Sequence, residues 1–259
     1  GMAEEKNPSS ELIEAYKAYT FEDAEMAFWG AQAAQKRKQW RDAFSLFNNA
    51  AQISYQKIQS IKSKDKKSFD KNIYNIFEGS LLGSIDVSEQ SQDIVMRSQA
   101  YDQYLKLNSN GDKALDVEYQ IAQVALEEKK YEEAAQKFKA VVYSHRKDTG
   151  INDKASDLSL DTLVILKDDK KIEQWSNEYA KHFPKRKKEF LAISRKAVLN
   201  QAAQVINNSN SKSDLDGQYE ILSNTDMSTS TEEEVKLFNK HRILIAGKTK
   251  NLDALIAST

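Results

Sequence analysis

The 259-residue sequence contains no cysteine, only two prolines and only eight glycines. The absence of cysteine excludes disulfides, thiol nucleophiles and thiolate metal sites. Proline and glycine both destabilise the interior of a helix, so their scarcity favours long uninterrupted helices. No apolar run approaches the roughly 18 residues of a transmembrane helix, and no alternating run of Val, Ile and Thr indicates a strand. The composition predicts an all-α chain without a transmembrane segment.

An excess of one charge is also missing, because 38 Lys and Arg face 39 Asp and Glu, for a net charge of −1. This balance argues against a general polyanion binder, although it permits a local basic patch. We therefore expect no nucleic-acid partner. No signal peptide is visible. A leader could have preceded Gly1 and Met2, so the bacterial periplasm and the cytoplasm both stay open.

Motifs that carry chemistry are absent from the sequence as well. It has no glycine-rich phosphate loop and no nucleophile elbow. The three histidines, His145, His182 and His241, are scattered, and none forms a pair at four-residue spacing. Zinc sites need such pairs when thiolates are missing. We predict no catalytic residues, no metal site and no cofactor.

Apolar residues recur at three- and four-residue steps along most of the chain, which is typical of amphipathic helices. Residues 1–9 look like a disordered lead-in, and Ser10 can cap the helix that follows. Asp112 can cap another helix after a turn at 108–112, a further turn is expected at 148–150, and Thr231 with Glu234 forms a capping box. The predicted helices cover residues 11–39, 40–61, 68–82, 88–107, two helices within 115–142, then 152–167, 170–183, 185–206, 215–222 and 235–246, with a lysine-rich connection at 62–67, a loop at 207–214 and a weak helical segment at 252–257.

Small residues recur at a spacing of twelve, most clearly at Ala122 and Ala134. Two antiparallel helices approach closely only where side chains are small, and large residues one turn away then fill the groove beside them. The same spacing occurs at Ala31 and Ala43, and again, without the aromatic residues, at Gly79 and Ser91. The residues that complete the two stronger patterns are Tyr131, Phe138 and Val141 in one and Trp40, Phe47 and Ala50 in the other.

These two patterns resemble the tetratricopeptide-repeat (TPR) family over about half of the chain. The Trp-Leu-Gly signature of the first helix and the closing proline of that family are missing. Residues 157–184 also resemble bacterial TPR-containing proteins of the cell envelope. The resemblance implies a right-handed superhelix of four or five antiparallel helix hairpins, a TPR-like α-solenoid, at residues 10–206. Residues 207–259 would add C-terminal helices that could continue it.

The resemblance also implies a non-enzymatic scaffold or adaptor that binds a protein or peptide on its concave face. A helical enzyme-associated module is an alternative, and so is a self-assembling subunit of a bacterial envelope complex. Fold alone does not decide among these functions.

The resemblance assigns partner binding to the inner helix of each hairpin. In three hairpins its inward positions include Glu25, Phe28 and Trp29, then Asp116, Tyr119, Gln120, Gln123 and Glu127, then Asp157, Leu160, Asp161, Val164, Lys167 and Asp168. Acidic residues outnumber basic ones at these positions. We expect a mildly acidic groove with aromatic anchors, suited to a basic or amphipathic peptide. The alternative is that the charges only face solvent and that the aromatic residues pack between repeats.

Two charged clusters each have a functional and a structural interpretation. The basic run at 181–188 could bind an anionic polymer or lipid, but it also falls at a helix C-terminus, where cations are favoured. Asp153, Asp157 and Asp161 share one helix face and could act in acid–base chemistry or bind calcium. An exposed carboxylate stripe is the commoner outcome for such spacing.

Overall fold

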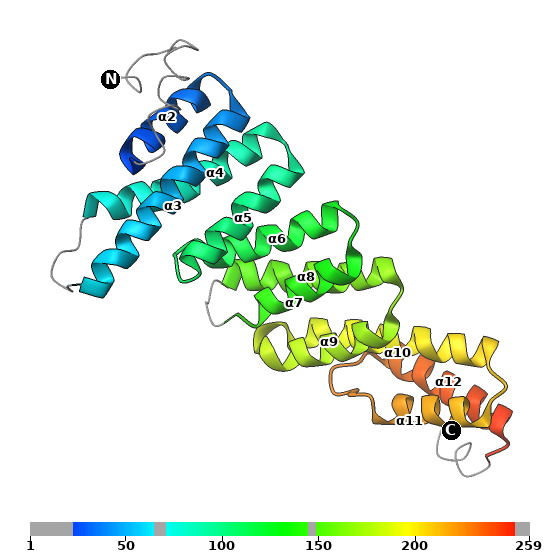
Figure 1. The fold of residues 1–259 in the computed structure, drawn as a ribbon. Coiled ribbons are helices and arrows are strands. Elements are labelled where there is room, and N and C mark those ends of the chain that lie inside the picture. The colour runs from blue at the N-terminus through cyan, green and yellow to red at the C-terminus, as the bar shows by residue number, and fades with distance from the viewer. Residues whose placement is uncertain (1–22, 65–70, 145–148, 252–259) are drawn as a thin grey trace. The chain divides into compact units, whose positions relative to one another are not determined.

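A computed structural model describes residues 23–64, 71–144 and 149–251, and within these ranges every regular element is a helix (Figure 1). The all-α prediction is confirmed for this part of the chain. None of the described helices combines the length and the apolar content that a membrane crossing requires. The helices are α2 (Ala24–Lys36), α3 (Trp40–Lys64), α4 (Lys71–Ser91), α5 (Ile94–Asn108), α6 (Ala114–Glu127), α7 (Tyr131–Val142), α8 (Thr149–Leu166), α9 (Asp169–His182), the 3-10 turn η2 (Pro184–Arg186), α10 (Lys187–Asn208), α11 (Lys212–Asn224) and α12 (Glu232–Thr249).

Several predictions fall outside the described residues. They are the lead-in at 1–9, the Ser10 cap, residues 11–22 of the first predicted helix, residues 65–67 of the lysine-rich connection, the start of the helix predicted at 68–82, His145, the start of the turn at 148–150 and the segment 252–257. The first half of the lysine-rich connection belongs to α3, which continues to Lys64. The chain divides between Glu128 and Lys129 into two compact units. The first unit contains α2 to α6, and the second contains α7 to α12.

Small side chains bring the first helices of unit 1 together. Ala31 on α2 and Ala43 on α3 are fully buried in one apolar cluster, which also contains Phe47 and Ala100. Asp23 begins α2 by accepting hydrogen bonds from two backbone N–H groups of its first turn, as an N-cap residue does. The twelve-residue spacing of small residues therefore corresponds to a helix contact at this place.

The predicted break between residues 82 and 88 is wrong, because α4 continues to Ser91. Gly83 does not end the helix. A Cβ atom at Gly83 would lie 2.6 Å from Cζ of Phe47, so glycine serves here to admit the aromatic ring. The real break follows at Gln92, which has φ of 58°, and Asp93 then caps α5 through the N–H groups of its first turn.

The small residues that face each other between α4 and α5 are therefore not the predicted pair. Gly79 and Ser91 both lie on α4 and do not face each other across a hairpin. Ser88 on α4 and Ala100 on α5 have the twelve-residue spacing, and both are fully buried. Arg97 stands in this pattern where the other two have an aromatic residue, so the sequence pattern is weaker here.

Other predicted boundaries move by a few residues. Asp112 caps no helix, since α6 begins at Ala114 without a side-chain cap. Thr149 and Gly150 belong to α8 and not to a turn. Helix α10 continues to Asn208, which shortens the predicted loop at 207–214 to three residues. The predicted capping box of Thr231 and Glu234 is confirmed.

In unit 2, α9 packs antiparallel between α8 and α10. The Tyr179 hydroxyl on α9 lies 2.8 Å from the Ser159 hydroxyl on α8, and its ring meets Phe190 of α10 edge to face at 5.6 Å. Helices α8 and α10 therefore run in the same direction on either side of α9, and Figure 1 shows the three helices in succession. A second cluster, with Val198, Phe238 and other residues, joins α10 to α11 and α12.

Arg195 lies at the contact between α10 and the segment that leads into α12. Its side chain is only 2% exposed. The guanidinium donates to both carboxylate oxygens of Glu234 at 3.1 and 3.2 Å, to the hydroxyl and carbonyl of Thr229, and to the carbonyl of Asp226. All three of its nitrogens therefore have acceptors, as a buried arginine requires.

Within residues 23–64, 71–144 and 149–251, five residues other than glycine adopt a left-handed backbone conformation. Each follows a helix directly or within two residues of its end, at positions where glycine is the usual choice. They are Lys38, Gln92, Lys129, Lys167 and Lys250, with φ between 55° and 60°.

Candidate functional site

A groove of about 620 Å³ lies along α8, α9 and α10. All of its lining belongs to unit 2. Helix α8 contributes residues at steps of three and four, α10 does the same, and α9 supplies the floor. The lining residues are Leu160, Asp161, Val164, Lys167, Asp169, Ile172, Ile193, Lys196, Ala197, Asn200, Ala203 and Gln204.

The interior of the groove is apolar. Leu160 and Ile172 are 4% and 5% exposed, so their side chains are already held by the core. Val164, in contrast, is 59% exposed although it is purely hydrophobic. An exposed aliphatic side chain above a buried apolar floor is a surface that gains free energy when another apolar group covers it.

Three charged side chains on the groove lining have no counter-ion. The side chains of Lys167, Lys196 and Asp161 form no ion pair or hydrogen bond within the described part of the chain. The pKa of Asp161 is raised, first because partial burial disfavours its charged form and second because Asp157 is close by. These groups can meet charges on a bound molecule without first breaking an internal pair.

A polar network closes the groove at the start of α9. The Asp169 carboxylate accepts hydrogen bonds from the side-chain amides of Asn200 at 2.9 Å and Gln204 at 3.1 Å. Gln201 donates to the Asp169 carbonyl and to Glu173. These bonds tie the C-terminal half of α10 to the α8–α9 turn, and they leave Asp169 already satisfied.

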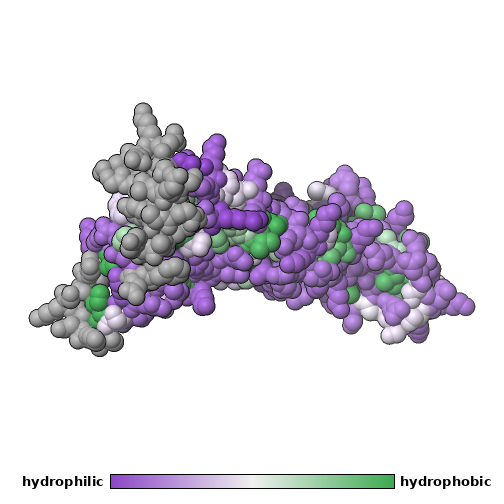
Figure 2. All heavy atoms as spheres, turned by 45° about the horizontal axis from the view of Figure 1, so that its top comes forward, coloured by the Kyte–Doolittle hydropathy of each residue, from purple (hydrophilic) through white to green (hydrophobic). Residues whose placement is uncertain are grey.

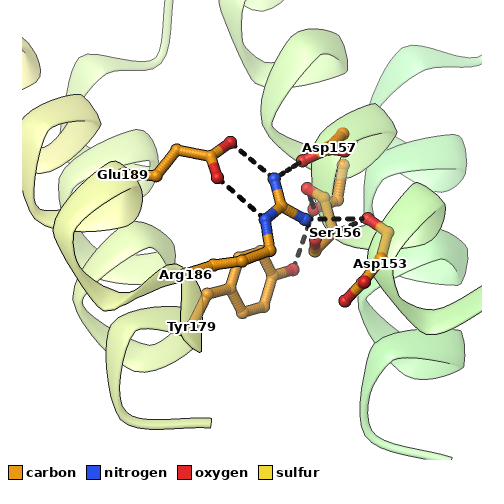
Figure 3. Close-up of polar contacts among 7 residues, drawn as sticks. Asp153, Ser156, Asp157, Tyr179, Arg186 and Glu189 are labelled. Carbon is orange, nitrogen blue, oxygen red and sulfur yellow. Dashed lines mark hydrogen bonds and ion pairs between the residues drawn. The ribbon is translucent and has the colours of Figure 1, made fainter. Parts of the chain in front are cut away.

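A second network, centred on Arg186, links the beginnings of α8 and α10 (Figure 3). Its guanidinium donates to both carboxylate oxygens of Glu189, at 2.9 and 2.6 Å, and to Asp157 at 2.6 Å. It also donates to the Ser156 hydroxyl at 3.2 Å and to the carbonyl of Asp153. A bidentate arginine pair of this kind fixes geometry as well as charge. The groove therefore lies between two polar networks, one at each of its ends.

Of the three acidic residues predicted to bind a partner at the α8–α9 hairpin, only Asp161 lines the groove. Other inward positions of the same hairpin lie there with it. These are Leu160, Val164 and Lys167. Asp157 is bound by Arg186 instead. Asp168 caps α9 and pairs with Lys171 at 2.9 Å. Burial alone raises the pKa of Asp168, but the hydrogen bonds and charge of Lys171 outweigh it, so the net pKa is lowered.

On α2, the predicted residues have contacts within unit 1. Phe28 packs against the core, with its ring edge to face with Phe47 at 5.9 Å. Trp29 is 41% exposed, and its indole N–H lies 3.4 Å from the Glu25 carboxylate. Phe28 thus has a packing role, whereas Trp29 and Glu25 lie on the surface.

On α6, Glu127 forms an ion pair with Arg97 of α5. The Tyr119 hydroxyl accepts a hydrogen bond from Gln123 at 2.9 Å. Asp116 and Gln120 are half-buried. Partner binding by the α2 and α6 residues stays a prediction.

The α10 side of the groove was missing from the predicted site. Ile193, Lys196, Ala197, Asn200 and Gln204 follow one another at helical steps of three and four, and that signal is visible in the sequence. The twelve-residue spacing does not identify α10 as an inner helix, because no pair of small residues with that spacing joins α10 to α11.

The other candidate clusters have local contacts. His182 packs edge to face against Tyr143 and Phe183, and His241 shares a hydrogen bond with the Leu237 carbonyl through Nδ1. No group of three or more His, Asp or Glu side chains among the described residues is arranged to hold a metal ion. Figure 2 views a face where hydrophilic residues predominate and hydrophobic ones form separate patches.

Comparison with protein-family models and with curated proteins finds no match to this chain.

Proposed function

We propose that this chain is a TPR-like helical-repeat scaffold that binds a short segment of another protein in the groove of α8, α9 and α10. The exposed Val164 over the buried Leu160 and Ile172 is the observation that carries the proposal, because it is an apolar recess with polar groups at its edges.

The spacing of buried residues supports the repeat part of the proposal. One pattern of buried residues recurs after 34 positions of the sequence, which is the length of a TPR unit. The positions that match at this separation are Ser88 with Ala122, Ala100 with Ala134, and Tyr104 with Phe138, and all six side chains are 0% exposed. Each matched pair keeps the same size class, which is typical of a sequence repeat of that length.

The inward positions that the TPR resemblance assigns favour α8 and α10 as inner helices. Four of the predicted inward positions of α8 line the groove, and α10 runs parallel to α8 with α9 behind them. In a stack of helix hairpins, parallel inner helices form the surface that partners contact.

Selection from a displayed library of random 16-residue peptides tests this function. The full chain is immobilised, and enriched peptides are measured again on Val164→Glu, which places a charge in the groove. We expect at least a tenfold loss of affinity, since an apolar contact is replaced by a buried charge. Ile165→Glu is the matched control, because Ile165 is 53% exposed on the same helix and does not line the groove.

Failure to enrich any peptide would refute the proposal. So would enriched peptides that bind Val164→Glu and Ile165→Glu equally well. Circular dichroism of both variants checks that α-helix content is retained.

A further inference from the structure

We infer that the segment bound by this groove is an amphipathic helix of about two turns whose carboxylates face Lys167 and Lys196. This inference rests on the proposed function, and it concerns the conformation and the charge of the partner. It follows from the length of the groove and from the charges that are left unpaired along it.

The length of the groove favours a helical occupant. Along α8 and the residue that follows it, the lining extends from Leu160 to Lys167, which corresponds to about 10 Å at the helical rise of about 1.5 Å per residue. Arg186 ties one end and Asp169 the other. An extended peptide would place only about three residues in this span, whereas a helix places two turns there. Residues at i, i+4 and i+7 of such a helix can then contact the apolar floor.

The unpaired charges are distributed unevenly along the groove. Because α8 and α10 run parallel, Asp161 and Ile193 lie toward the Arg186 end, and Lys167 and Asn200 lie toward the Asp169 end. Lys196 falls between them on α10. Two ammonium groups thus occupy the middle and one end, against one carboxylate at the other end.

This charge pattern favours an acidic partner, whereas the sequence alone suggests a basic one. The difference arises because internal cations engage the acidic side chains near the groove. Asp157 is bound by Arg186, and Asp168 is bound by Lys171. Asp169 is satisfied by neutral amides of α10. The charged side chains that stay unpaired are Asp161 toward the Arg186 end of the groove, Lys196 in the middle and Lys167 toward the Asp169 end.

Three synthetic 15-residue peptides test the inference by fluorescence anisotropy at low ionic strength. The first has leucines at i, i+4 and i+7 with flanking glutamates, the second has lysines in place of the glutamates, and the third is the first with a central proline. We expect the acidic peptide to bind about tenfold more tightly than the basic one, since two pairs are attractive in one case and repulsive in the other. The proline peptide should lose at least that much.

A charge-reversed variant assigns the effect to the groove. Lys167→Glu/Lys196→Glu should favour the basic peptide over the acidic one. Lys185→Glu/Lys188→Glu is the matched control, because it makes the same change of net charge at exposed lysines outside the groove. That control should keep the acidic preference.

The outcomes separate this inference from the proposed function. Equal or tighter binding of the basic or the proline peptide would overturn the inference, while library-selected peptides that depend on Val164 would still support the groove as a binding site. If no peptide of any kind binds, both fail. Self-association of the chain that Val164→Glu abolishes and Ile165→Glu does not would assign the groove to a second copy, and would also overturn the inference.

Discussion

Replacement of Arg195 by methionine should strongly destabilise the second unit. Methionine fills most of the same volume but cannot donate hydrogen bonds. The change removes five hydrogen bonds to Glu234, Thr229 and Asp226 and leaves the Glu234 carboxylate without its counter-ion. Loss of one partner of a buried pair costs about 3–5 kcal/mol. Glu234 is 26% exposed and can regain some water, so we expect about 3 kcal/mol, the lower end of that range.

Urea unfolding measures this loss of stability if the tryptophan fluorescence comes from the second unit. Trp175 is buried in the same unit as Arg195, so Trp29→Phe and Trp40→Phe leave one informative tryptophan. With an m-value of about 2 kcal/mol/M, the midpoint should fall by about 1.5 M. Lys196→Met is the matched control, because the neighbouring residue on α10 is exposed and unpaired, and a change within about 0.5 kcal/mol is expected. Equal midpoints for the two variants would refute the reasoning.

Two further predictions concern pH and helix packing. Burial alone raises the pKa of Glu234, but hydrogen bonds from Arg195 and from the Thr231 backbone outweigh it and lower the net pKa. The carboxylate therefore stabilises the fold above the ordinary pKa of glutamate, about 4.3, and this stability is lost as the pH falls through the lowered value. The gap in urea midpoint between wild type and Glu234→Gln should shrink from about pH 6 to about pH 3, and a constant gap would contradict this. Gly83→Ala should lower the free energy of unfolding by about 1–3 kcal/mol, and the thermal midpoint with it, because the new Cβ atom meets the buried Phe47 ring. Gly247→Ala has open space around the new Cβ atom and should raise the free energy of unfolding by up to about 1 kcal/mol. Equal changes in both glycine variants would remove the packing argument for Gly83.

The helices could be predicted from the sequence because their apolar periodicity is local. Most predicted helix bounds agree with the structure to within a few residues, and the capping box of Thr231 and Glu234 is present as predicted. The error at α4 has a physical cause. Gly83 weakens a helix when judged by propensity alone, yet its missing side chain admits Phe47, which lies 36 positions earlier in the chain. A contact of that separation leaves no mark in a local pattern.

The site was only partly predictable, for the same reason. Spacing places Leu160, Val164 and Lys167 on one face of a helix. It does not show that Arg186, 29 residues after Asp157, forms an ion pair with that carboxylate, which is then not available to a bound partner. The charge of the groove therefore depends on tertiary pairing, which sequence counts of acidic and basic residues leave out.

The left-handed residues after the helices have a consequence for engineering this chain. A non-glycine residue in that conformation costs about 1 kcal/mol, so glycine at Lys38, Gln92, Lys129 or Lys250 should raise thermal tolerance. Lys167 is different, since it carries one of the two ammonium groups over the groove. At that position the same replacement would gain heat resistance but remove a positive charge from the groove, so under the proposed function Lys167 is where stability and binding conflict.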